Sequence, residues 1–163
     1  MLFRSIEWRS GTPEVKKLLD FLNKDMLGGG PKQIRMDSAI AIKPMSPFGT
    51  KRLMRRAIQY ALENKKRVVT IMHKGNIQKF TEGAFRDWGY ELAADEFRAQ
   101  TVTERETWIL GNKDKDPNIT VEQNAALVEP GLEQATEAFR KSVYDEVKSV
   151  LDSQPADQQI VII

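Results

Sequence analysis

Lys74 and Asn76 are the two side chains whose chemical types and spacing best suit a ligand site. They stand in the polar turn of residues 73–76, which follows a short apolar run and precedes a segment with helical periodicity that opens at Thr81. The apolar run predicts a buried strand over residues 67–73, and Thr81 predicts the start of a helix. Ligands commonly bind where a strand of an α/β sheet ends, so this turn is a candidate site.

An ordinary structural turn would show the same residue types. Gly75 and Asn76 are favoured in turns for backbone reasons, and a lysine in such a turn is commonly only solvated. His73, taken alone, is better explained as a hydrogen-bonded structural residue than as a ligand. Residue types by themselves favour this structural interpretation and leave the catalytic one open.

Other arrangements of catalytic residues find little support. The sequence holds one histidine and no cysteine, which excludes a disulfide scaffold and a thiolate metal site. Its aspartates and glutamates are scattered among lysines and arginines at the spacing of helix surfaces, so we expect no metal site built from this chain alone. A serine, histidine and aspartate triad would be a chance combination.

A longer string weighs against the purely structural interpretation. Residues 73–90 read His-Lys-Gly-Asn-Ile-x-Lys-Phe-Thr-Glu-Gly-Ala-Phe-x-Asp-Trp-Gly-Tyr, and this string resembles the NADP-dependent isocitrate dehydrogenases of bacterial type. The resemblance covers most of residues 6–98, including an Ile-Glu-Trp motif at residues 6–8. The stretch from Thr101 to Gly131 looks like the insertion of the cyanobacterial branch of that family.

The resemblance implies an oxidoreductase of the tricarboxylic acid cycle. Such an enzyme oxidises isocitrate with NADP⁺ and releases carbon dioxide with the help of Mg²⁺ or Mn²⁺, giving 2-oxoglutarate. Lys74 matches the family's catalytic lysine, which reaches into the partner subunit's site. Asn76 matches an asparagine near the nicotinamide of NADP and the substrate, so we expect it to be a cofactor-binding residue.

The rest of the family's active site lies outside the resembling region. This applies to the metal-binding aspartates, the groups that hold isocitrate, the proton-donating tyrosine and the adenosine-phosphate site. We therefore expect the chain to be a fragment of a longer enzyme and to be inactive alone. The alternative is a non-catalytic dimerisation or interaction module that retains the scaffold.

Composition adds few constraints on partners. The 163 residues carry a net charge of +2 with 29% charged residues, and the basic residues form no extended block of the kind that binds nucleic acid. No apolar run approaches the ~20 residues of a membrane span. We expect neither a nucleic-acid nor a membrane partner, and a cytoplasmic location.

The fold class expected is α/β. By resemblance, the chain contains the family's clasp strands and part of its small domain, with a mixed sheet flanked by helices. We divide it into a clasp-like dimerisation segment (6–44), a small-domain α/β part (45–98), a helical insertion (99–153) and an atypical tail (154–163). In the family, the clasp interlocks strands of two subunits, which implies a homodimer.

Local patterns predict the individual elements. We expect strands at 6–8, 33–36 and 39–43, and a possible edge strand in the tail at 160–163. A helix capped by Thr12 and stopped by the glycines at 28–30 precedes a second helix over 47–66. Capping boxes at Thr103 and Thr120 open two more helices around a charged loop at 112–118, and apolar residues from Leu132 to Val150 indicate a final long helix.

Two further features allow more than one interpretation. Lys51, Arg52, Arg55 and Arg56 cluster near the start of the second helix, where they form either a solvated face or an anion-binding patch. Residues 1–5 lack the tyrosine that precedes the Ile-Glu-Trp motif in the family. We hypothesise that the family-like sequence begins near Ile6.

Overall fold

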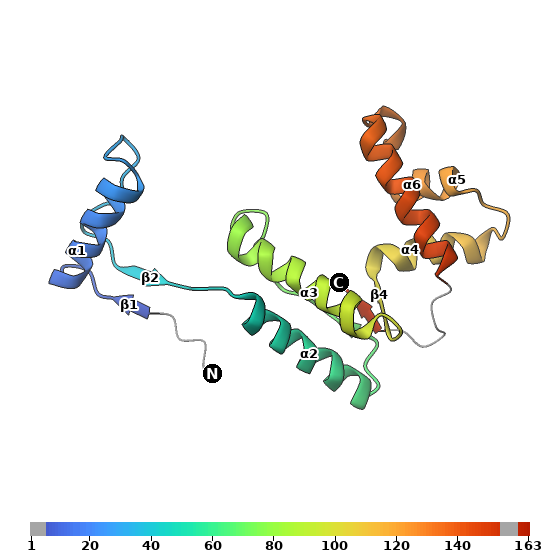
Figure 1. Cartoon of the computed structure of the whole chain (residues 1–163), viewed down its shortest axis with the longest axis horizontal. Coiled ribbons are helices and arrows are strands. Elements are labelled where there is room, and N and C mark those ends of the chain that lie inside the picture. Colours follow the sequence, from blue (N-terminus) through green and yellow to red (C-terminus); the bar gives the residue numbers. More distant parts are fainter. Residues whose placement is uncertain (1–5, 154–159) are drawn as a thin grey trace. The chain divides into compact units, whose positions relative to one another are not determined.

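The computed structural model describes residues 6–153 and 160–163. The hypothesis on residues 1–5 and most of the predicted tail lie outside the described residues. The chain forms two compact units, residues 1–44 and 45–163, and each is described by itself (Figure 1). The α/β class is confirmed, with antiparallel pairing in one unit and parallel pairing in the other.

The first unit is an antiparallel strand pair with one helical arm. Strand β1 (Ile6–Trp8) pairs with β2 (Ile40–Ile42), as the predicted strands require. Helix α1 (Pro13–Phe21) starts at Thr12, whose hydroxyl accepts a hydrogen bond from the Val15 amide. It continues as the π-helical segment η1 (Leu22–Met26). The glycines then end the helix, because Gly28 and Gly29 both have φ of 65°, a left-handed conformation that favours glycine.

The strand predicted at 33–36 is wrong. Ile34 uses its backbone in another way: its amide donates to Asn23 Oδ1 at 2.8 Å, and its carbonyl accepts from Asn23 Nδ2 at 2.9 Å. Both groups that a neighbouring strand would need are therefore occupied by one carboxamide. The segment is held against the helical arm and does not pair with a strand.

The second unit opens with α2 (Pro47–Glu63), capped by Ser46. This helix ends earlier than the predicted 66, because Lys65 adopts a positive φ of 52° and the Lys66 amide closes on the Ala61 carbonyl at 2.8 Å. Met54, Ile58 and Ala61 of this helix are buried, whereas Leu53 and Leu62 are exposed.

Helix α3 (Ala84–Phe97) packs against α2. Lys51 contacts Glu91, and Arg55 contacts Glu96, so the basic cluster of α2 engages carboxylates of α3. Hydrogen bonds from Arg55 hold the pKa of Glu96 below its usual range. The helix start predicted at Thr81 is two residues late, because the helix begins with the π-helical turn η2 (Lys79–Gly83) and Thr81 lies inside that turn.

Three parallel strands form the sheet of this unit in the order β3 (Val68–Val69), β5 (Ile160–Ile162), β4 (Thr101–Thr103). The strand expected at 160–163 is present, but its expected position at the edge is wrong, because β5 is the central strand. Ile160 and Ile162 are 4% and 0% exposed and pack in one core with residues of α2 and α3. The strand β5 takes the central position because its isoleucines are buried in the core and both of its edges pair with a neighbouring strand.

The predicted strand over 67–73 is mostly wrong, because only Val68 and Val69 form the regular ladder. One further hydrogen bond, from the Ile71 amide to the Ile163 carbonyl at 2.7 Å, extends the pairing. Beyond Ile71 the chain leaves the sheet and enters the polar turn.

The predicted helical insertion contains α4 (Glu104–Lys115), α5 (Val121–Val128), the 3₁₀ turn η3 (Leu132–Gln134) and α6 (Glu137–Asp152). Both capping boxes are confirmed. The charged loop expected at 112–118 is partly wrong, because α4 continues to Lys115 while Asn112 donates to Asn124 on α5 at 2.9 Å. The final helix starts after Thr136, which caps it, and not near Leu132.

One arginine bridges these three helices, which share an apolar core. Arg105 on α4 donates to Glu129 at 2.8 Å and to Glu146 on α6 at 3.0 Å. Burial acts against its charged form, but these carboxylates raise the pKa of Arg105 overall. In the part of the chain that the structure describes, no helix has the length and apolar character needed to cross a bilayer.

We expect Ile162→Ala to lower the free energy of unfolding of the chain by about 2–5 kcal/mol, because it leaves a cavity in the core beside the central strand. Urea unfolding monitored by circular dichroism measures this loss. Ile163→Ala, at the exposed next position, is the matched control and should cost far less. Equal losses in the two variants would contradict the central packing of β5.

Candidate functional site

The turn that carries Lys74 lies beyond the carboxyl end of β3. The three strands are parallel, so the carboxyl ends of β3, β4 and β5 lie at the same edge of the sheet. The turn therefore follows a strand of a parallel sheet, as the sequence predicted, and its role as a ligand site stays a prediction. From β3 the chain continues through residues 70–74, turns at residues 75–77 and enters η2.

Backbone hydrogen bonds fix the shape of the turn. The Ile77 and Gln78 amides donate to the Lys74 carbonyl at 3.1 and 3.0 Å, and the Gly83 amide donates to the Gln78 carbonyl at 3.0 Å. The Gly75 amide donates to His73 Nδ1 at 3.0 Å. His73 therefore acts as a structural acceptor, as its sequence context suggested.

Two glycines allow the turn to close on the following helix. A Cβ added to Gly75 would lie 2.8 Å from His73 Nδ1 and 2.9 Å from the Gly83 Cα atom. Gly75 is buried, although its neighbours in the turn are exposed. The sequence indicates Gly75 as a turn residue. Only the structure shows its close approach to the backbone of Gly83.

Lys74 and Asn76 both face solvent. The Lys74 amide makes a long hydrogen bond of 3.4 Å to Glu82 Oε2. Within residues 6–153 and 160–163, no hydrogen bond or ion pair engages the Lys74 ammonium. The turn thus holds its backbone rigidly and leaves an ammonium and a carboxamide available to a ligand from outside.

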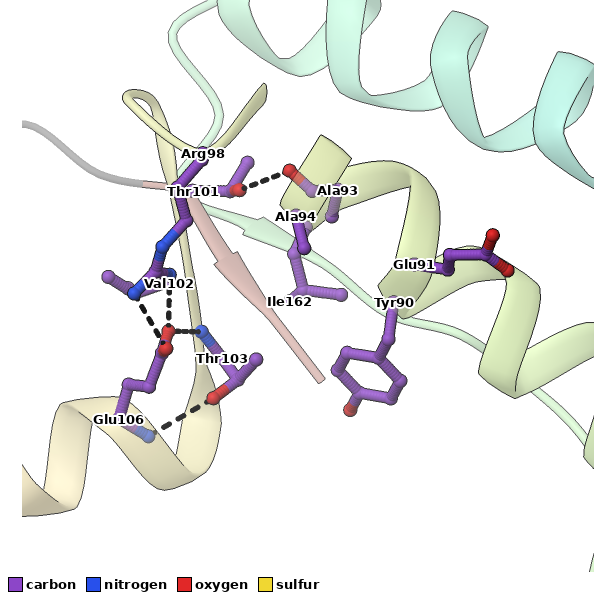
Figure 2. A pocket seen from close by; sticks show the side chains of 10 residues that line it. All are labelled: Tyr90, Glu91, Ala93, Ala94, Arg98, Thr101, Val102, Thr103, Glu106 and Ile162. Atoms are coloured by element: carbon purple, nitrogen blue, oxygen red, sulfur yellow. Dashed lines mark hydrogen bonds and ion pairs between the residues drawn. The ribbon is translucent and has the colours of Figure 1, made fainter. Parts of the chain in front are cut away.

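A separate hollow of about 450 Å³ lies between α3, β4 and the start of α4. Figure 2 shows Arg98 and Thr103 converging on the carboxylate of Glu106, which accepts from Arg98 Nη1 at 2.9 Å and from the Thr103 amide at 2.8 Å. Burial raises the pKa of Tyr90, and the negative charge of Glu104 adds to the effect. Lys74 and Asn76 do not line this hollow, and the Glu106 carboxylate in it already accepts hydrogen bonds from Arg98 and Thr103.

The described residues do not form a set of ligands for a metal ion. Among the described residues, no group of three or more histidine, cysteine, aspartate or glutamate side chains is placed to hold a metal ion. Lys74 supplies a positive charge and Asn76 a donor and an acceptor, which suit a carboxylate and an amide respectively.

Comparison with known proteins identifies the family. The model for isocitrate/isopropylmalate dehydrogenase matches residues 19–113, which include the whole turn. The chain belongs to the isocitrate/isopropylmalate dehydrogenase family.

Three relatives in this family carry the same name. The chain is 51% identical over 158 residues to a Synechocystis protein named isocitrate dehydrogenase (NADP), an alignment that covers 93% of this chain and 33% of that protein. A Nostoc protein of the same name is 50% identical over the same shares. A Haloferax volcanii protein of that name is 54% identical over 66% of this chain and 25% of its own length. The chain thus spans about a third of the first two of these curated relatives.

The family match does not assign roles to single residues. Lys74 and Asn76 lie inside the matched range, and their catalytic and cofactor-binding roles stay predictions. The sequence analysis singled out these polar side chains and overlooked the exposed apolar side chains beside them, which belong to Met72, Ile77 and Phe80. Their unusual exposure could not be read from residue types, because apolar residues next to a strand and a helix are usually core.

We expect Gly75→Ala to distort the turn, since the new methyl group would collide with backbone atoms of Gly83 that cannot rotate away. The free energy of unfolding should fall by roughly 1–3 kcal/mol, and the Lys74 and Asn76 amide resonances should shift. Gly111→Ala on α4 is the control, because nothing lies within 4 Å of its added Cβ. That variant should keep or slightly raise stability. Two variants with equal stability and unshifted turn resonances would contradict the close approach.

Proposed function

We propose that this chain supplies the Lys74 turn of an NADP-dependent isocitrate dehydrogenase that converts isocitrate to 2-oxoglutarate. The observation that carries the proposal is 51% identity, over 93% of the chain, to a protein named isocitrate dehydrogenase (NADP). The structure supports it with a turn that is held by backbone hydrogen bonds and presents an unengaged lysine in the segment that follows a strand of a parallel sheet. Because the chain spans about a third of that relative, the reaction requires the remaining parts of the enzyme.

Lys74 has two roles in this proposal. Its positive charge attracts a carboxylate of the substrate, and its nitrogen passes a proton to or from the substrate hydroxyl during oxidation. Asn76 follows two residues later on the same rigid turn, so its carboxamide is positioned beside the same ligand. There it hydrogen-bonds to the nicotinamide of NADP.

The divalent ion of this reaction, Mg²⁺ or Mn²⁺, requires oxygen ligands that the described residues do not cluster. We therefore assign no step through the ion to this chain. When bound, such an ion polarises the hydroxyl and then the carbonyl oxygen of the substrate. The chain's own contribution is the lysine, the carboxamide and the turn that positions them.

The enzyme in this proposal is a cytoplasmic homodimer of the tricarboxylic acid cycle. The strand pair of residues 6–8 and 40–42 supports a dimer, because a two-stranded sheet alone is marginal in water and Ile6 and Ile42 are exposed on it. We propose that these strands associate with those of a second chain as a clasp. Lys74 then acts in the site of the partner subunit.

We expect Lys74→Met to lower kcat by roughly 10²–10⁴-fold with little change in Tm, because a proton-relay group acts in the chemical step and an exposed lysine loses little packing. The measurement is isocitrate-dependent NADP⁺ reduction by a hybrid in which this chain replaces the matching third of the Synechocystis relative. Lys148→Met, at an exposed lysine on α6, is the matched control. The 163-residue chain alone serves as the blank and is expected to be inactive.

Subunit mixing sharpens this experiment. Hybrids with Lys74→Met are combined with hybrids that lack a metal-binding aspartate in the other part of the enzyme. If each site takes Lys74 from one chain and the aspartate from the other, mixed dimers recover activity at one of two sites. Near-normal turnover of Lys74→Met would end the catalytic assignment, and the alternative of a non-catalytic interaction module would then take its place.

We expect self-association of the chain to weaken when Ile40 and Ile42 are both replaced by serine, because the strand pair then loses the apolar side chains that a partner would cover. Sedimentation velocity at micromolar concentration measures the change. Met26→Ser is the control within the same unit, since Met26 is exposed but lies away from the strands. A chain that is monomeric before and after the substitutions would contradict the clasp.

A further inference from the structure

The second unit contains two hydrophobic cores that share no residue. The first core joins the sheet to α2 and α3 and includes Ile58 and Ile162. The second core joins α4, α5 and α6 and includes Ile109 and Val147. All four of these side chains are 0% exposed. Each core therefore stabilises its own set of elements by burial among themselves.

The second core lies in the connection between two neighbouring strands. β4 ends at Thr103, β5 begins at Ile160, and the two strands pair in parallel. A parallel pair needs a crossover connection, which a single helix usually supplies. Here α4 supplies it, because α4 contacts both β4 and β5. Helices α5 and α6 pack on α4 and on each other, so they are an addition to the crossover helix.

The range that matches the family divides the chain at the same place. This range ends at residue 113, near the end of α4 and before α5 begins. The crossover helix thus belongs to the part shared with the family, whereas α5 and α6 lie outside the matched range. Two independent observations, the cores and the matched range, separate the same helices from the sheet.

Polar contacts attach α5 and α6 to the outer side of α4. The Asn124 side chain on α5 is fully buried and donates to the Ile109 carbonyl at 3.0 Å. Arg105 donates to Glu129 at 2.8 Å and to Glu146 at 3.0 Å. All the groups in these contacts lie within residues 104–152. Breaking them would open the second core and leave the contacts of the first core in place.

An ion pair beside the hollow in Figure 2 joins the elements of the two cores. Arg98, which follows α3, contacts Glu106 on α4 at 2.9 Å, and the Arg98 side chain is 44% exposed. A partly exposed ion pair contributes little to stability. We therefore expect the coupling between the cores to be weaker than the packing within each of them.

We infer that α5, η3 and α6, which pack on α4, form a conformational module that opens as one unit while the sheet, α2 and α3 stay folded. Proteins open locally in cooperative units of this kind, each built from contiguous contacts. The Lys74 turn lies between β3 and α3, in the part that stays folded. The module can therefore change its conformation without disturbing that turn, whatever reaction the enzyme catalyses.

Hydrogen exchange of the backbone amides of the 163-residue chain, followed by NMR, tests this inference. Val147→Ala removes two methyl groups from the second core and should speed exchange of the protected amides in α5 and α6 about tenfold or more. Amides of α2 and α3 should keep their rates. Ile58→Ala is the matched variant in the first core, and it should speed exchange in α2 and α3 without changing the rates in α5 and α6.

Arg105→Lys provides a second, milder variant. Lysine keeps the positive charge but lacks the planar fork that bonds two carboxylates at once, so exchange should again become faster in α5 and α6 alone. The inference is overturned if Val147→Ala or Ile58→Ala speeds exchange equally around both cores. It is also overturned if neither Val147→Ala nor Arg105→Lys changes exchange in α5 and α6, or if these helices show no protected amides in the unsubstituted chain.

Discussion

The parallel pairing of β5 between β3 and β4 is the interaction on which the second unit depends. Through it, Val161 pairs with Val68, 93 residues earlier in the sequence, and with Val102, 59 residues earlier. Ile160 and Ile162 give α2 and α3 a surface on which to bury Ile58 and Leu92. Because all three strands point the same way, the segment that leads to the Lys74 turn leaves the sheet at the carboxyl ends of the strands, the side on which parallel sheets usually bind ligands.

Backbone hydrogen bonds hold the turn in its shape, and the side chains of Lys74 and Asn76 remain available to a ligand. The amides of Gly75, Ile77 and Gln78 all find acceptors within residues 73–74, so these three amides are satisfied without the side chains of Lys74 and Asn76. A catalytic lysine needs this division, because a side chain used to stabilise its own loop is not free to engage a substrate. The hollow in Figure 2 differs in this respect, because its Glu106 carboxylate already accepts hydrogen bonds from the Thr103 amide and from Arg98.

The sequence predicted elements well where the signal was local. Thr12, Thr103 and Thr120 cap helices as their spacing to the following residues indicated, and the glycines after η1 end the first helix. Predictions failed where a distant segment decides the outcome. The extended segment around Ile34 is held by Asn23, eleven residues away, and the terminal apolar run became a central strand only because β3 and β4 lie on either side of it. No local pattern contains that information.

The candidate site shows the same division between local and distant information. Residue types alone left Lys74 as an ordinary turn lysine, and only a family resemblance raised it to a catalytic candidate. The structure adds what neither could supply: the turn is rigid, its lysine is unengaged among the described residues, and its apolar neighbours point outward. These properties allow the turn to present Lys74 without changing its own shape, which is what the proposed role of this lysine requires.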